Sequence, residues 1–267
     1  MIAALLAAAG LAAAPPAPEA PPRAPTKGWV VDYADTFCSA SREYGDAQNP
    51  LLFVLRPSPT GELLQLFVIR PSHYVSAEHI PVTLDYAGRT EKTTALVYGS
   101  HKTSRRFLLV NLGGEAATAV AKAKTVAIRS KDGDFAFAVP GMPQAMAALE
   151  TCNADLRALW NISDEKRASI AVPAKPAASL ASWVGPEDYP AQALREDVGG
   201  SSKVLLFVNE QGKVADCLLV ETSGNASLDA MTCIAMRDRG KFQPALDGAG
   251  KPMRSVYRQK ISWRLSP

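Results

Sequence analysis

The chain has 267 residues, enough for two domains of about 100–150 residues each. Hydrophobic residues make up 47% and charged residues 21%, which excludes a wholly disordered chain. The 29 Lys and Arg against 26 Asp and Glu give a net charge of +3, which argues against a nucleic-acid-binding protein, because such proteins usually carry a strongly basic domain. Three His residues leave little scope for His-based catalysis or a His-rich metal site, so we expect no metal and no cofactor.

The N-terminal segment, residues 1–26, has the character of a signal peptide followed by a proline-rich spacer. Residues 2–14 form an apolar run whose helix would be about 20 Å long, too short for about 30 Å of bilayer hydrocarbon. Small residues at 12–14 offer a cleavage site, so we predict export to the periplasm. Because no Lys or Arg precedes the run, two alternatives stay open: an upstream start that extends it into an inner-membrane anchor, and an Ala-rich disordered tail.

The four cysteines fit an exported chain, because exported compartments are oxidising and favour disulfides. Cys38, Cys152, Cys217 and Cys233 contain no C-x-x-C pair, which weakens zinc-ribbon and thioredoxin-like interpretations. Three pairings are possible, and local pairing within two domains favours Cys38–Cys152 and Cys217–Cys233. Buried free thiols are the alternative.

The first region, residues 27–165, predicts an antiparallel β-rich domain with a C-terminal helix. Short apolar or alternating runs indicate strands at 28–33, 51–55, 63–69, 94–98, 107–112, 125–128 and 135–139. The turn sequence RPSPTGE between the second and third of these runs predicts a hairpin. After it, Gly141-Met142-Pro143 opens a helix that carries apolar residues on one face as far as Trp160.

The second region predicts a small α+β domain over residues 183–267, behind a linker at 166–182 that is rich in small residues. The expected order is a short helix after Tyr189-Pro190, a hairpin of 203–208 and 213–220, a helix ending near Gly240, and a last strand at 255–265. The whole chain is therefore expected to be α+β.

This second region resembles the C-terminal domain of the TonB energy-transducer family. The resemblance is carried by Tyr189-Pro190, Gly212-Lys213-Val214, Ser223-Gly224, Phe242-Gln243-Pro244-Ala245 and Gly250-Lys251-Pro252-Met253, in this order. It implies a periplasmic protein that binds an extended segment of an outer-membrane TonB-dependent receptor by strand addition, in energy-dependent transport. It also implies contact with the proton-driven motor proteins of the inner membrane.

The last strand is the expected contact surface. Tyr257, Ile261, Trp263 and Leu265 share one face with Gln259, while Arg258, Lys260, Ser262 and Arg264 share the other. With Tyr189, the partner-binding residues that the resemblance implies are Tyr257, Arg258, Lys260, Ser262 and Arg264. Protection of a sheet edge by Lys and Arg is an alternative role for these charges, and it is compatible with binding.

The proline-rich spacer and the apolar N-terminal segment are shorter than an energy transducer that spans the periplasm needs. Residues 15–25 contain six prolines but extend only about 34 Å, and no anchor of spanning length is visible. A second hypothesis is therefore a soluble envelope binding or scaffolding module that is not coupled to the proton-motive force.

A third hypothesis, an exported enzyme, finds little support in the sequence. G-x-S-x-G, H-E-x-x-H and P-loop motifs are missing. His73 and His79, with Tyr74 and Glu78 nearby, are a candidate metal or acid–base cluster, although a solvated loop is the more ordinary interpretation. His101-Lys102 with Arg105-Arg106 is a basic patch for which a solvated turn is likewise the simpler explanation. We therefore expect a protein that is not an enzyme.

Overall fold

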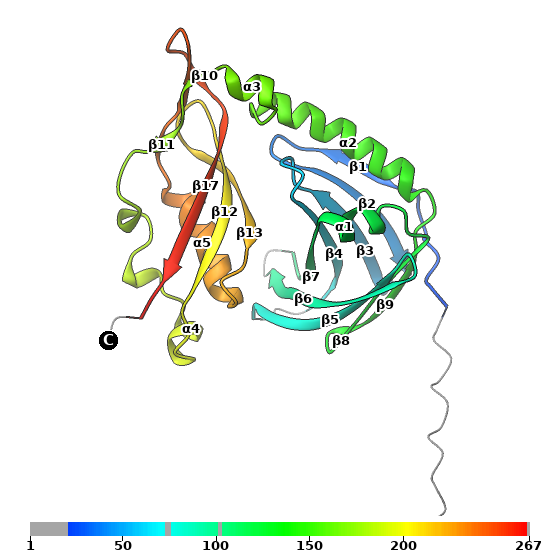
Figure 1. Cartoon of the computed structure of the whole chain (residues 1–267). Helices are drawn as coiled ribbons and strands as arrows, with labels where there is room; N and C mark the ends of the chain where they lie inside the picture. The colour runs from blue at the N-terminus through cyan, green and yellow to red at the C-terminus, as the bar shows by residue number, and fades with distance from the viewer. Residues whose placement is uncertain (1–20, 73–75, 101–102, 266–267) are drawn as a thin grey trace, which may run out of the picture.

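The computed structural model describes residues 21–72, 76–100 and 103–265. The apolar N-terminal run, His73, Tyr74 and His101-Lys102 lie outside the described residues. Figure 1 shows a large curved sheet beside a smaller α+β unit, so the predicted α+β class is confirmed.

The N-terminal domain is one curved antiparallel sheet. Its nine strands in the described chain are β1 (Val30–Tyr33), β2 (Cys38–Gly45), β3 (Pro50–Pro57), β4 (Leu63–Pro71), β5 (Glu78–Tyr86), β6 (Arg89–Ser100), β7 (Arg105–Gly113), β8 (Thr125–Ser130) and β9 (Gly133–Ala138). Their order is β1-β2-β3-β4-β7-β6-β5-β8-β9. Arg23 bridges to Phe137 of β9 and Pro25 to Tyr44 of β2, so the segment before β1 links the two sides of the sheet into a barrel-like shape.

The concave side of this sheet holds the larger hydrophobic core. Alternate residues such as Leu64, Leu66 and Val68 of β4 point inward and are buried, as period-2 alternation requires. The helix α2 (Met142–Leu159) runs along the sheet and contributes Leu149 and Leu156 to the core; α1 (Gly114–Val120) follows β7. The predicted hairpin exists as β3 paired with β4.

The segment between the domains is not a free spacer in the structure. It contains α3 (Asp164–Ala168), β10 (Ile170–Val172), β11 (Lys175–Pro176) and the 3-10 turn η1 (Leu180–Ser182). Strand β10 pairs with β15 (Ala245–Asp247), and β11 pairs with β14 (Phe242–Gln243). The chain therefore joins the second domain as two short strands before the predicted start of that domain.

The C-terminal domain has the predicted element order. After η2 (Pro186–Asp188) come α4 (Ala191–Arg195), β12 (Gly200–Val208), β13 (Val214–Glu221), α5 (Ala226–Arg239), β14, β15, β16 (Pro252–Met253) and β17 (Ser255–Trp263). The sheet order is β13-β12-β17, all antiparallel, and α5 covers one face. The side chain of Asn225 caps α5 by accepting hydrogen bonds from the backbone of Ser227 (3.0 Å) and Leu228 (3.2 Å).

Gly240 ends α5 as predicted, but it does not adopt the left-handed conformation that glycine commonly has at the end of a helix. Its φ is −60°, which any residue adopts. Glycine is required there by a close approach instead, since a Cβ would lie 2.3 Å from the carbonyl oxygen of Met236.

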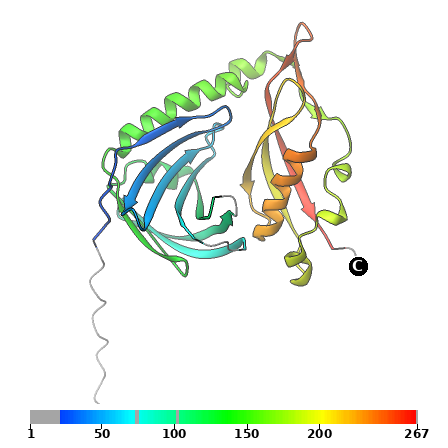
Figure 2. The ribbon, with the colours of Figure 1, turned by 180° about the vertical axis from the view of Figure 1, so that it is seen from behind.

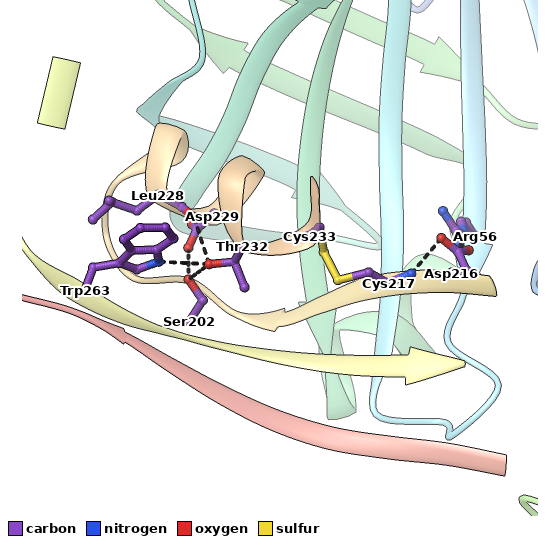
Figure 3. Close-up of a disulfide and its surroundings, with 9 residues drawn as sticks. All are labelled: Arg56, Ser202, Asp216, Cys217, Leu228, Asp229, Thr232, Cys233 and Trp263. Atoms are coloured by element: carbon purple, nitrogen blue, oxygen red, sulfur yellow. Dashed lines mark hydrogen bonds and ion pairs between the residues drawn. A yellow bond between two sulfur atoms is a disulfide. The ribbon is translucent and has the colours of Figure 1, made fainter. Parts of the chain in front are cut away.

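Both disulfides favoured by local pairing are present. Cys38–Cys152 ties β2 to α2, and Cys217–Cys233 ties β13 to α5. The second bond is drawn in Figure 3.

The two domains pack directly on each other. Leu205, Phe207 and Leu218, on the face of the small sheet opposite α5, belong to the core of the N-terminal domain. Phe207 meets Trp160 at the end of α2 edge to face, with ring centroids 5.1 Å apart. In Figures 1 and 2, β13 lies nearest the barrel and β17 farthest from it.

Candidate partner-binding site

Strand β17 has the two-faced character that its sequence predicts. Ile261 and Trp263 are buried against α5, whereas Arg258, Lys260 and Ser262 on the opposite face are exposed. Apolar residues on alternate positions form a strand because one face is buried and the other is solvated. The buried face fixes the register of β17 on β12, so the position of its other edge is also fixed.

The outer edge of β17 has no strand partner in the described chain. All nine residues of β17 are in register with β12, and the sheet order places β17 at one end. The N-terminal domain lies beyond the other end of this sheet (Figure 1). The main-chain groups on the far side of β17 therefore have no strand partner in the described chain, the arrangement to which an extended segment adds as a further strand.

The basic residues beside this edge differ in their surroundings. Arg258 donates hydrogen bonds to Glu62 in the β3–β4 turn, one of them 2.9 Å long, and these bonds raise the pKa of its guanidinium. Lys260 and Arg264 are exposed, and neither has an ion-pair partner in the described chain. Ser262 lies with its hydroxyl 2.9 Å from that of Ser201 on β12. Arg258 is thus already used within the molecule, while Lys260 and Arg264 are available to a partner.

The two tyrosines of the predicted site have structural roles. The Tyr189 hydroxyl donates to the carbonyl of Val198 at 2.8 Å, its ring meets Trp263 edge to face at 5.4 Å, and burial raises its pKa. Tyr257 packs edge to face on Phe242 with centroids 5.0 Å apart. Both rings therefore brace β17 from the α5 side, and they do not lie on the same face as Arg258.

A buried polar network holds β17, β12 and α5 together (Figure 3). Asp229 is 2% exposed and accepts hydrogen bonds from the hydroxyls of Ser202 (2.7 Å) and Thr222 and from the backbone of Ser223 (2.7 Å). Thr232 extends the network to the indole of Trp263, which donates to its hydroxyl at 2.9 Å. A buried carboxylate is tolerated because its oxygens are satisfied in this way.

The candidate metal or acid–base cluster of the N-terminal region is not assembled by the described residues. His79 reaches the C-terminal domain, where its Nε2 lies 3.6 Å from the carboxylate of Asp229, while Glu78 pairs with Lys131. No group of three or more His, Cys, Asp or Glu side chains suited to a metal ion occurs within residues 21–72, 76–100 and 103–265. In the predicted basic patch, Arg106 is paired with Asp132 and Arg105 is exposed.

The interface between the domains brings in residues that sequence reasoning missed. Arg56 of β3 donates to Asp216 of β13 at 3.0 Å, and Asp216 also accepts from Thr36. Burial lowers the pKa of Arg56, and Asp216 opposes that shift. Glu62 is the partner of Arg258 described above. No local sequence signal marks these pairs, because each joins residues 160 or more positions apart.

Comparison with protein-family models matches residues 186–265 to the family described as Gram-negative bacterial TonB protein C-terminal. The second domain is thus a TonB C-terminal domain, as its motifs predicted. A comparison of the chain with curated proteins gives no match. The family match covers the second domain alone and does not extend over the N-terminal barrel; it supports a TonB-like envelope protein in energy-coupled transport. None of the helices in the described part of the chain has the length and apolar character needed to span a bilayer.

Proposed function

We propose that this protein is a periplasmic binding protein, not an enzyme, that takes an extended segment of an outer-membrane TonB-dependent receptor as a fourth strand on the outer edge of β17. The observation that carries the proposal is the unpaired edge of β17 at the end of the sheet. Main-chain hydrogen bonds supply affinity, and Lys260 and Arg264 favour a segment with acidic side chains beside the edge.

The way in which the domains pack supports a second candidate, a scaffolding module without coupling to the proton-motive force. The segment that joins the domains is tied down by the β10–β15 and β11–β14 pairings instead of forming an extended reach. A receptor-binding protein that spans the periplasm needs such a reach, or an anchor upstream of the residues described.

The test measures binding of a synthetic receptor segment to the full chain by isothermal titration calorimetry. Consecutive residues of a strand point their main-chain groups to opposite sides, so only one of Gln259 and Lys260 directs its N–H outward. We expect one of the variants Gln259→Pro and Lys260→Pro to lose peptide binding with an unchanged melting temperature, and the other to lower the melting temperature, because its N–H pairs with β12.

Two further results distinguish the receptor-binding function from the scaffolding function. Binding by the wild type that is lost on N-methylation of the peptide supports strand addition. A wild-type chain that does not bind the receptor segment, although it is folded, contradicts the first candidate and leaves the scaffolding module.

A further inference from the structure

A cleft lies between the two domains, on the opposite side of the small sheet from β17. Its volume is about 500 Å³, within the range of ligand sites, which occur preferentially at domain interfaces. One wall is formed by residues 219–222 at the end of β13. The other is formed by barrel residues, namely Leu63, His79, Thr93, Thr94, Leu96, Leu109 and Asn111.

The β13 wall is the edge of a strand. Successive side chains of a strand point to opposite faces, so four consecutive residues line one cleft only when the strand presents its edge. Within the described chain, β13 pairs with β12 alone and ends the sheet on this side. The register also shifts here: Glu221 faces Lys203 and Leu219 faces Val204, which leaves Val220 without a partner on β12.

The barrel wall is the face of a sheet. Leu96 and Leu109 are directly paired across β6 and β7, and Leu96 is also paired with His79 on β5, so these side chains form one row. Their neighbours Ala95, Val97, Leu108 and Val110 belong to the hydrophobic core of the barrel, so the row points to the other side and lines the cleft, where Leu109 is 8% exposed.

Asn111 adds a polar group to this wall. Its Oδ1 accepts a hydrogen bond from Nε2 of Gln65 at 3.1 Å, which leaves its side-chain N–H groups without a partner in the described chain. Charge is nearly balanced: besides His79, the lining has only Glu221, which is paired with Lys203.

We propose that this interdomain cleft binds an extended, uncharged peptide segment of a partner protein, which pairs its main chain with the edge of β13. One row of its alternating side chains lies on Leu96 and Leu109, and Asn111 donates to one of its carbonyls. The three β13 residues of the cleft, Leu219–Glu221, correspond to about 10 Å of extended peptide, so a short segment suffices. This site is separate from the edge of β17 and does not depend on the function proposed above.

The test uses the full isotope-labelled chain and one probe, the peptide acetyl-Thr-Val-Thr-Leu-Thr-Val-Thr-amide, followed by NMR amide shifts. We expect saturable shifts at residues 219–222 and at Leu96 and Leu109. Leu96→Glu should weaken binding about tenfold or more, because it places a charge on the apolar wall. The matched control Leu159→Glu makes the same change on the exposed side of α2 and should leave binding unchanged.

A change in the probe keeps the test independent of how Leu96→Glu folds. Two methylated forms of the peptide are used, one with N-methyl groups on the odd residues and one with N-methyl groups on the even residues. At least one of them should fail to bind the wild type. Binding of both forms with the affinity of the unmodified peptide overturns the pairing with β13. Shifts confined to β17, or no saturable shift at millimolar peptide, overturn the site. Binding in the cleft that persists in the β17 proline variants separates this result from the receptor-binding proposal.

Discussion

The buried side chain of Tyr44 makes the stability of the barrel depend on pH. It is 1% exposed, its hydroxyl donates to the carbonyl of Ala138 at 2.8 Å, and its ring lies 4.8 Å from that of Phe137. Burial raises its pKa to about 12, with Arg42 opposing. The unfolded chain therefore loses this proton at lower pH than the folded chain, so the contribution of Tyr44 to stability is complete below about pH 10 and is lost as the pH approaches 12.

We therefore predict that Tyr44→Phe flattens the fall in stability between pH 10 and 12. At neutral pH the variant should lose about 1 kcal/mol, because the carbonyl of Ala138 loses its partner. Urea unfolding at pH 8 and at several values above 10 measures both effects. Tyr33→Phe, at a residue 60% exposed, is the control and should follow the wild type. If the stability of Tyr44→Phe falls between pH 10 and 12 as steeply as that of the wild type, Tyr44 is not the source of the pH dependence. Tyr86, whose pKa is also raised, is present in both proteins and contributes equally to both curves.

Some features of the candidate site can be predicted from the sequence, and others cannot. The alternation of β17 follows from side-chain period alone, and the structure agrees with it at Ile261 and Lys260. The sequence around Asp229 indicates no more than an acidic residue in the first turn of α5. Its partner Ser202 lies on β12, and Trp263, at the far end of the network, lies on β17, so no local pattern can show that this carboxylate is buried.

At the level of the elements, the turn between β12 and β13 explains one of the family motifs. Gly212 has φ +73°, and a Cβ there would lie 1.9 Å from the carbonyl oxygen of Phe242. Its own carbonyl accepts from the backbone of Phe242 at 2.8 Å, so the turn is fastened to β14. Glycine is required here both for the left-handed conformation and for the close approach.

Gly224 provides a matched comparison, because its φ is +89° but its Cβ would enter open space. We predict that Gly224→Ala costs about 1 kcal/mol, from the backbone conformation alone, and that Gly212→Ala costs about 2 kcal/mol more, because β14 must move as well. Thermal and urea unfolding of the two variants measure the difference. If both variants lose the same free energy of unfolding, β14 can move away from residue 212 without loss of stability.

Two strands of the barrel were not predicted, and each has a physical reason. β2 contains the polar run from Ser39 to Glu43, which lacks a clear alternation of apolar residues. β5 contains Pro81, which disfavours a central strand, yet β5 lies between β6 and β8. The predicted linker has no apolar periodicity because its short strands β10 and β11 bury little of their surface. Tertiary pairing decides these segments, and single-sequence patterns do not contain it.

For the whole molecule, the ion pairs between the domains differ in burial. The side chains of Arg56 and Asp216 are 23% and 16% exposed, while those of Arg258 and Glu62 are 57% and 39% exposed. Arg56 also lies over the ring of Phe37, 4.3 Å from its centroid. A shielded pair in a fixed geometry is coupled more strongly than an exposed pair, which water and salt screen.

We predict a coupling energy of about 1–3 kcal/mol for Arg56 and Asp216 in a double-mutant cycle with alanine, and less than about 1 kcal/mol for Arg258 and Glu62. Unfolding in urea at two salt concentrations gives both values, and the second should shrink more at high salt. If the two couplings are equal, the first pair does not hold the domains together.

The strands β10 and β11 have a mechanical consequence. If a captured receptor segment is pulled away from the barrel, the tension first loads the packed interface between the domains. Once that interface has separated, the tension passes through residues 170–176, where β10 and β11 are paired with β15 and β14. Each of these strands is paired at only two positions, so we expect β10 and β11 to separate from their partners before the larger sheets unfold. The released chain then lengthens the connection between the domains by several residues of slack, while both cores stay folded and each is closed by its own disulfide.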